Sequence, residues 1–268
     1  MQSHINTPSK YNLGKYTIPE LSIGDLSLKN REISVLSERP FPRDKIVVGF
    51  MGSAANQPDK SGNEFQPTEE QEKLGEKIGQ IVAARGSILS NGAVYGIPYS
   101  SINGAHHFGG YTMGISPWPN EKTHKETNHP LKCLDLILYA GFDFNKDPTF
   151  SFTIRDAINT YYPDIVISVN GRWGTLNEGS GAIQQGRIYI PIKGSSGATD
   201  LILDAIQNKK IVKDTGAIIL IPDNTSHSLE YAINQAIDEA ERRWEAEGRT
   251  QNRFSHVIDK LEKAMGIK

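Results

Sequence analysis

The feature that most constrains the fold is an apolar run at residues 164–169, Asp-Ile-Val-Ile-Ser-Val, followed by a glycine turn. The run is apolar at nearly every position instead of every second one, which is typical of a strand that helices cover on both faces. The turn, at residues 171–175, offers small residues and backbone N–H groups at a helix start, an arrangement that holds anions such as phosphate. The sequence therefore predicts a ligand site at the carboxyl end of this strand.

The same alternation of strand, glycine turn and helix recurs along the chain. Helical spacing starts at a capping box formed by Thr68 and Gln71, and again at Ile154, where Ala157 belongs to the expected buried stripe and Arg155 lies off it. Strands are predicted at residues 45–49, 87–89, 111–115, 134–139, 187–192 and 216–221. Alternation of this kind predicts an α/β fold with a doubly wound, mostly parallel sheet, helices on both faces and right-handed crossovers.

The chain divides into an extension and one domain. Residues 1–40 are polar and irregular, although residues 16–18 and 32–36 alternate enough to pair as edge strands; we expect a surface extension packed on the domain or on a subunit partner. Residues 41–268 form the expected single domain. Within it, residues 116–133 are rich in proline and too long for a plain connection, so we expect an insertion that serves as a lid or a subunit contact.

Composition restricts the partners and the compartment. The 268 residues carry a formal net charge of −2, which gives no global electrostatic reason to expect nucleic acid or an anionic membrane as a partner. The longest apolar runs are too short to span a bilayer, and the start of the chain has no apolar core of the signal-peptide kind. A single cysteine, Cys133, fits a reducing compartment. We therefore expect a soluble cytoplasmic protein.

Further glycine turns are candidates for the same ligand site. Gly52 and Ser53 follow the strand at 45–49, and Asn91 and Gly92 follow the strand at 87–89. The chain contains neither a GxGxxG nor a GxxxxGK[ST] motif. With the turn at 171–175 they suggest a site for a nucleotide or another phosphorylated small molecule. The candidate binding residues are Gly52, Ser53, Asn91, Gly92, Gly171, Arg172, Gly174 and Thr175.

The sequence gives little reason to expect a metal. His124, His129 and Cys133 lie close together in the insertion, but their spacing matches no standard zinc pattern. We therefore expect neither a metal nor a cofactor.

The motif Gly171-x-x-Gly174-Thr175-x-x-Glu178, with Arg155 twenty-three residues ahead of the glutamate, resembles a known family. It is similar to the Rossmann-like proteins once labelled lysine decarboxylases, whose best-known members are the lonely guy cytokinin riboside monophosphate phosphoribohydrolases. The wider superfamily includes molybdenum cofactor carrier proteins and DNA-processing protein A. The resemblance runs from about residue 45 to residue 192.

This resemblance implies a Rossmann-like fold, a homodimer and specific site residues. Arg155 falls on the family's catalytic arginine and Glu178 on its catalytic glutamate, while Gly171, Gly174 and Thr175 fall on the phosphate-binding turn. The chain also departs from the pattern. Arg172 replaces a glycine of the turn, Asp156 stands where a lysine is usual, and Ile158-Asn159 replace a Glu-Met pair. Arg172 could strengthen anion binding or block the pocket.

Two functions and one structural alternative follow. In the first function, Glu178 stabilises an oxocarbenium-like ribose while the N-glycosidic bond of a nucleoside 5′-monophosphate is hydrolysed to base and ribose 5-phosphate, and Arg155 holds the glutamate and the ligand oxygens. In the second, the protein is a non-catalytic carrier or sensor of a phosphorylated ligand. Structurally, Thr175-x-x-Glu178 is itself a capping box, and Arg155 could be a salt-bridge partner.

Overall fold

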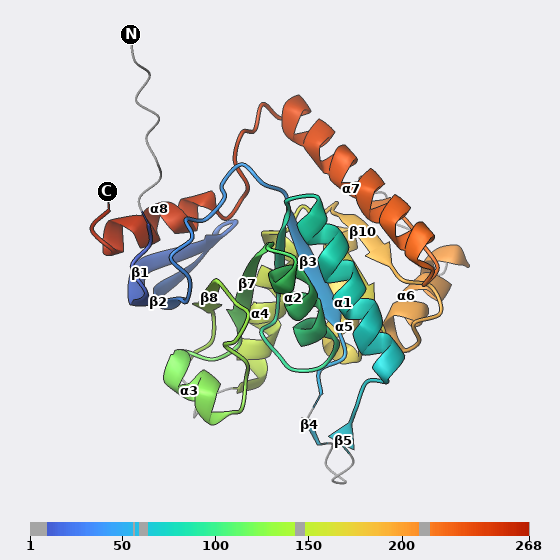
Figure 1. The fold of residues 1–268 in the computed structure, drawn as a ribbon, viewed down its shortest axis with the longest axis horizontal. Helices are drawn as coiled ribbons and strands as arrows, with labels where there is room; N and C mark the ends of the chain where they lie inside the picture. Colours follow the sequence, from blue (N-terminus) through green and yellow to red (C-terminus); the bar gives the residue numbers. More distant parts are fainter. Residues whose placement is uncertain (1–9, 56, 59–63, 143–147, 209–214, 268) are drawn as a thin grey trace.

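A computed structural model describes residues 10–55, 57–58, 64–142, 148–208 and 215–267 (Figure 1). Its central element is a nine-stranded sheet in the order β1-β2-β8-β7-β6-β3-β9-β10-β11. The strands are β1 (Gly14–Ile23), β2 (Leu26–Val35), β3 (Val47–Gly52), β6 (Ile88–Asn91), β7 (Tyr111–Ser116), β8 (Leu136–Tyr139), β9 (Ile165–Val169), β10 (Ile188–Pro191) and β11 (Ile218–Ile219). A separate small ribbon pairs β4 (Gln57–Pro58) with β5 (Glu64–Phe65).

Neighbouring strands from β8 to β11 run parallel, whereas β1 and β2 form an antiparallel hairpin that pairs with β8. The predicted α/β fold with a mostly parallel sheet is therefore confirmed. Every described residue of the central strands β3, β6, β7, β8 and β9 is buried, apart from half-buried Gly52. Their continuous apolar runs are explained by helices on both faces. The hairpin shows that part of the N-terminal extension joins the sheet as edge strands.

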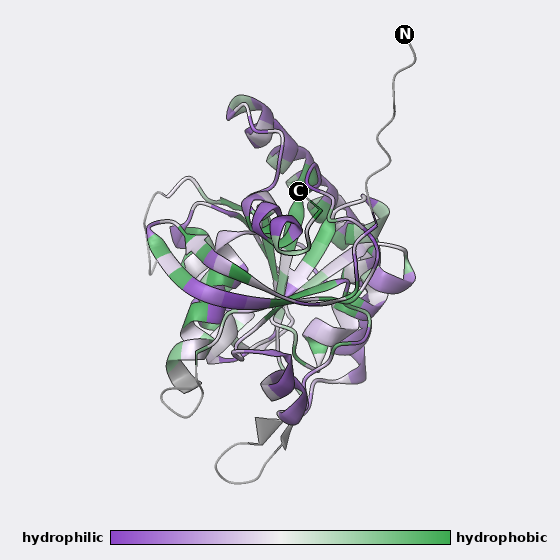
Figure 2. Ribbon diagram, turned by 90° about the vertical axis from the view of Figure 1, so that its left-hand side faces the viewer, coloured by the Kyte–Doolittle hydropathy of each residue, from purple (hydrophilic) through white to green (hydrophobic). Residues whose placement is uncertain are grey.

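Helices cover both faces of the sheet (Figures 1 and 2). One face packs against α1 (Glu69–Ala84), α2 (Ile97–His107) and α7 (Ser226–Ala246). The other packs against α4 (Pro148–Tyr161), α5 (Trp173–Gln184), α6 (Gly197–Gln207) and α8 (Ser255–Ala264). Successive residues of one strand point to opposite faces of the sheet. Val47 belongs to the core under α4 and α8, and Val48 belongs to the core under α1 and α2.

The strand order places a topological switch at β3. From β3 the chain moves outward through β6, β7 and β8, and then returns to place β9 on the opposite side of β3. The connections that leave β3 and β9 therefore diverge to opposite faces of the sheet, which opens a crevice at the carboxyl ends of these strands. The glycine turn predicted to bind a ligand begins directly after β9.

The insertion at 116–133 contains a short helix, α3 (Glu121–Glu126), packed beside the sheet. His124 is fully buried: its Nδ1 lies 2.9 Å from the Ser116 hydroxyl, and its Nε2 lies 3.0 Å from the Pro130 carbonyl oxygen. The Trp118 ring makes an edge contact with Phe152 of α4, with ring centroids 5.7 Å apart. The segment thus supports α4 through aromatic contacts.

Candidate functional site

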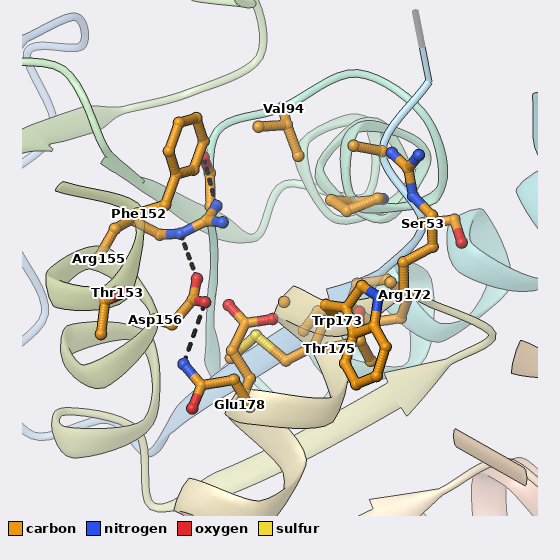
Figure 3. A pocket seen from close by; sticks show the side chains of 18 residues that line it. Ser53, Val94, Phe152, Thr153, Arg155, Asp156, Arg172, Trp173, Thr175 and Glu178 are labelled. Atoms are coloured by element: carbon orange, nitrogen blue, oxygen red, sulfur yellow. Dashed lines mark hydrogen bonds and ion pairs between the residues drawn. The ribbon is translucent and has the colours of Figure 1, made fainter. Parts of the chain in front are cut away.

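A pocket of about 610 Å³ opens at the switch point, between α4 and α5 (Figure 3). Five parts of the chain form its wall: the end of β3, the loop after β6, the start of α2, the middle of α4 and the start of α5. The residues that line it include Gly52 and Ser53, then Gly92, then Phe152, Arg155 and Asp156, then Arg172, Trp173, Gly174, Thr175, Asn177 and Glu178. Eight of the predicted site residues thus share one pocket.

The start of α5 presents a helix N-terminus to this pocket. Arg172 is the N-cap residue, with an extended backbone and no side-chain capping bond. Trp173, Gly174 and Thr175 form the first turn, whose N–H groups have no acceptor within the helix. Gly171 has φ of +98°, and a Cβ there would lie 2.3 Å from the Thr175 side chain, so this position requires glycine. The turn therefore directs N–H groups and a positive partial charge at the pocket.

Two predicted binding residues hold the turn together from within. The Gly171 N–H donates to the Ser53 hydroxyl at 3.0 Å and to the Asn170 side-chain oxygen at 2.6 Å. The Ser53 hydroxyl also lies 3.3 Å from that Asn170 oxygen. Gly171 consequently shapes the turn. Its N–H is bonded within the protein, and it does not line the pocket. Ser53 ties the end of β3 to the turn after β9.

The glycine turn after β6 contributes only in part. Asn91 is fully buried: its amide donates to the Pro98 carbonyl at 2.6 Å and its oxygen accepts from the Ala93 N–H at 2.9 Å. Its side chain shapes the turn and does not line the pocket. Gly92 does line it, and its carbonyl accepts from Arg155 Nη1 at 3.3 Å. A Cβ at Gly92 would lie 1.9 Å from that nitrogen, so glycine makes room for the arginine.

Arg155 projects from α4 across the pocket wall. Its Nε donates to Asp156 Oδ1 at 2.8 Å, and its guanidinium lies 5.8 Å from the centre of the Phe152 ring. Burial lowers the pKa of Arg155, but the charges of Asp156 and Glu178 outweigh burial and leave that pKa above its usual value. Arg155 therefore carries its charge permanently, and its direct bond goes to Asp156.

Glu178 is a buried pocket residue and not a helix cap. Because α5 begins at Trp173, Thr175 lies within the first turn and Glu178 in the second, so the expected capping box is wrong. The Glu178 carboxylate accepts from the Asn159 amide at 2.9 Å. Burial and the neighbouring charge of Asp156 raise the pKa of the Glu178 carboxyl to about 8, against the opposing effect of Arg155.

Asp156 and Asn159 complete the site, and the sequence reasoning did not assign them to it. Asp156 is buried and its Oδ2 accepts from the Asn177 amide at 3.3 Å. The predicted stripe of α4 was partly wrong, because Ala157 is exposed while Asp156 and Asn159 are buried against α5. A signal was present: Asp156 and Asn159 are departures from the resembled family pattern, three residues apart on one helix face. Both are placed beside Glu178.

Comparison with known proteins places this chain. The family model described as the SLOG cluster4 family matches residues 45–223, more than half of the chain. The chain belongs to the SLOG cluster4 family. This bears out the resemblance based on the glycine turn and Glu178. The SLOG cluster4 protein is also 26% identical over 125 residues to an uncharacterized protein of Archaeoglobus fulgidus, a match that covers 47% of this chain and 72% of that one.

Solved structures resemble the SLOG cluster4 protein in fold. The molybdenum cofactor binding protein from Rippkaea orientalis is 21% identical, with a TM-score of 0.51, over 71% of this chain and 96% of that chain. DNA processing protein A from Helicobacter pylori, described with its single-stranded DNA binding mode, is 16% identical, with a TM-score of 0.54, over 84% of this chain and 98% of that chain. At these identities the likeness shows the Rossmann-like fold alone.

These comparisons and the structure bear unevenly on the expected partners. DNA processing protein A from Helicobacter pylori is described with a single-stranded DNA binding mode, and for the present chain our expectation that nucleic acid is an unlikely partner stays a prediction. Within the part of the chain that the structure describes, no helix is long and apolar enough to cross a membrane. In the same residues no group of three or more His, Cys, Asp and Glu is arranged to hold a metal ion.

Proposed function

We propose that this SLOG cluster4 protein binds a nucleoside 5′-monophosphate in the pocket between α4 and α5 and hydrolyses its N-glycosidic bond. One observation carries the proposal: the open first turn of α5 and the buried Glu178 carboxyl, one turn further along the same helix, line the same pocket. An anion-binding end and an acid are thus held by one rigid element. A pocket of about 610 Å³ falls within the usual range for small-molecule sites.

The phosphate would bind at the start of α5. The N–H groups of Trp173, Gly174 and Thr175 and the helix dipole favour an anion there. Arg172, which also lines the pocket, adds a guanidinium that can form paired hydrogen bonds to phosphate oxygens. Gly174 is the position of closest approach, because among the described residues the only atom within 4 Å of a Cβ placed there is Asp156 Oδ2, at 3.8 Å.

The ribose and base would lie toward α4, next to Glu178. Cleavage of the bond between the anomeric carbon and the base nitrogen leaves positive charge on the ribose, which a nearby carboxylate stabilises. Arg155 is held by Asp156 and Gly92, so we assign it to fixing Asp156 and contacting the ligand, with Glu178 fixed by Asn159 instead. Phe152 and the exposed Trp173 offer aromatic faces for the base at the pocket wall.

A second candidate is a carrier or sensor that binds a phosphorylated ligand without cleaving it. The observation in its favour is the raised pKa of Glu178, because a protonated acid offers no negative charge to a cationic ribose. The molybdenum cofactor binding protein of similar fold is described as a binder. Under this alternative Arg172 and the α5 turn hold the ligand, and the carboxyl groups donate and accept hydrogen bonds.

The two candidates separate in a direct assay. Purified protein is incubated with the four common ribonucleoside 5′-monophosphates, free base is measured by liquid chromatography, and binding of each nucleotide is measured by isothermal titration calorimetry. The hydrolase proposal predicts release of at least one base. Measurable binding without release from any of the four excludes hydrolysis of these substrates and supports the carrier. Neither binding nor release contradicts both candidates for these ligands.

A further inference from the structure

We propose that Asp156 and Glu178 form a carboxyl pair that shares one proton, carried by Glu178 in the resting state, so that Glu178 is the general acid for the leaving base. Asp156 is then a positioning residue that keeps the proton on Glu178. The inference rests on the proposed hydrolysis for its chemical consequence, but the pair itself is a property of the free protein.

The geometry places the two acids together from different helices. Asp156 projects from α4 and Glu178 from α5; both are buried, both line the pocket, and their carboxyl groups point toward each other (Figure 3). Two buried carboxyl groups that face each other cannot both be ionised at low cost, so one proton between them is the stable arrangement.

The hydrogen-bond donors decide which acid keeps the proton. Asp156 accepts from the charged Arg155 Nε at 2.8 Å and from the Asn177 amide at 3.3 Å. Glu178 accepts one neutral bond, from the Asn159 amide at 2.9 Å. A charge-assisted bond stabilises an ionised acceptor more than a neutral bond does. Negative charge is therefore favoured on Asp156, and the proton on Glu178.

The other groups around Glu178 leave this assignment in place. From α4 it faces the negative charge of Asp156 and the positive charge of Arg155. From β10 it faces Tyr189, whose hydroxyl bonds to Ser168 at 2.7 Å and whose pKa is raised by burial, so it stays neutral. Burial and Asp156 together outweigh Arg155, and they keep the pKa of Glu178 above its usual value.

The chemical step balances with this pair alone. As the bond between the anomeric carbon and the base nitrogen breaks, its electron pair goes to the base, and the Glu178 proton is transferred to the base. Glu178 becomes a carboxylate as the ribose becomes cationic, so the negative charge forms when it is needed. Water then bonds to the anomeric carbon and gives its proton to Glu178. The products are free base and ribose 5-phosphate, and the pair again carries one proton.

The test is a titration of the free protein by carbon-13 NMR of the glutamate side-chain carboxyls, with the Glu178 signal identified by its loss in Glu178→Gln. We expect Glu178 to titrate well above an ordinary glutamate. In Asp156→Asn its midpoint should fall by about one to three pH units. Arg155→Met should move it upward, which gives a result of opposite sign should Asp156→Asn fold poorly. The control is Asp238→Asn. Asp238 lies on α7, is exposed and pairs with Arg85, so its substitution should leave the Glu178 midpoint unchanged.

An ordinary Glu178 midpoint in the wild type, or the same midpoint in Asp156→Asn, overturns the carboxyl pair. Kinetics supply the second readout: Asp156→Asn should shift the alkaline limb of the pH–rate profile to lower pH. A raised Glu178 midpoint that falls in Asp156→Asn, without base release by the wild type, leaves the pair standing and removes the hydrolase. Base release by the wild type together with an unchanged midpoint in Asp156→Asn supports the hydrolase and removes the carboxyl pair.

Discussion

Two buried acid and arginine clusters lie at opposite ends of the parallel strands and differ in charge balance. Before β9, Asp164 accepts from the Val47 N–H at 3.3 Å, the Trp244 indole at 3.1 Å, Arg253 at 2.8 Å and Arg249. Beyond the other end of β9, among the pocket residues that the structure describes, Arg155 is the cation whose charge acts on both Asp156 and Glu178. We call Asp164 with its two arginines the clasp, because two cations around one acid stabilise the fold. Two acids beside one arginine, as at Asp156 and Glu178, indicate a site that holds a proton.

The difference between the Asp164 cluster and the pocket cluster shows where buried charge stabilises the fold. The partners of Asp164 come from β3 and from the end of α7 with the segment that follows it, so the cluster joins these two parts of the chain to the start of β9. At Glu178, burial and the charge of Asp156 oppose ionisation of the carboxyl. A perturbed acid in a pocket is typical of functional sites, which favours a functional interpretation of the pocket cluster.

The largest predicted effect is on the clasp. Asp164→Ala leaves Arg249 and Arg253, both mostly buried, without their shared acceptor, and we expect it to lower the free energy of unfolding by about 3 to 4 kcal/mol. Asp156→Asn removes the acid that opposes ionisation of Glu178, and it should change the free energy of unfolding by less than about 1 kcal/mol. Urea unfolding at neutral pH measures both. Equal losses in the two variants would erase the distinction between the clusters.

Next in size is the backbone of the turn. Gly171→Ala places a Cβ against Thr175 at a φ of +98°, and should destabilise the protein by about 2 to 3 kcal/mol. It should also weaken nucleotide binding, because the turn positions the start of α5. Gly194→Ala is the control, since φ is also positive there but a Cβ would meet nothing within 4 Å. A Gly171→Ala loss no greater than that of the control contradicts close packing of the turn.

The pH dependence of stability comes third. The pKa of Glu178 is raised to about 8 in the folded protein, so the folded state binds more protons than the unfolded state above the usual glutamate range. Wild-type stability should therefore fall, relative to Glu178→Gln, as the pH rises from about 5 to about 8. Thermal or urea unfolding across this range tests it. A parallel pH course for the two proteins would argue that Glu178 is not protonated.

The smallest effect concerns Arg172. If its guanidinium assists the phosphate, Arg172→Gln should weaken binding of adenosine 5′-monophosphate about tenfold, with less salt dependence, and leave adenosine binding unchanged. Calorimetry with both ligands at two salt concentrations makes the comparison. Tighter nucleotide binding in Arg172→Gln would show instead that the arginine occludes the pocket.

The fold was predictable from the sequence because its central strands are buried on both faces. Continuous apolar runs marked β3, β6, β7, β8, β9 and β10 to within a few residues. The strand predicted at 216–221 is shorter in the structure, where β11 at the sheet edge contains only Ile218–Ile219. The hairpin of β1 and β2 was harder to place, since its acceptor strand β8 lies about a hundred residues further along the chain.

The candidate site was predictable only where backbone geometry sets it. Gly171 and the α5 turn stand out because glycine and a helix start leave a local pattern. Glu178 was placed in the right element, but its role depends on where α5 begins, and this is two residues before Thr175. Asp156, Asn159 and Asn177 were not assigned to the site because their bonds join α4 and α5, and the departures from the family pattern at Asp156 and Asn159 do not show which helix these side chains meet.

Whether Glu178 carries the hydrolysis is decided by the time course of free-base release from the ribonucleoside 5′-monophosphates by wild type and by Glu178→Gln. Glutamine keeps the size of the side chain and can still accept from the Asn159 amide, but it supplies neither a proton nor a negative charge. We expect the wild type to release base, and we expect the rate of release to fall about a hundredfold or more in Glu178→Gln. Release at the wild-type rate by Glu178→Gln would contradict it.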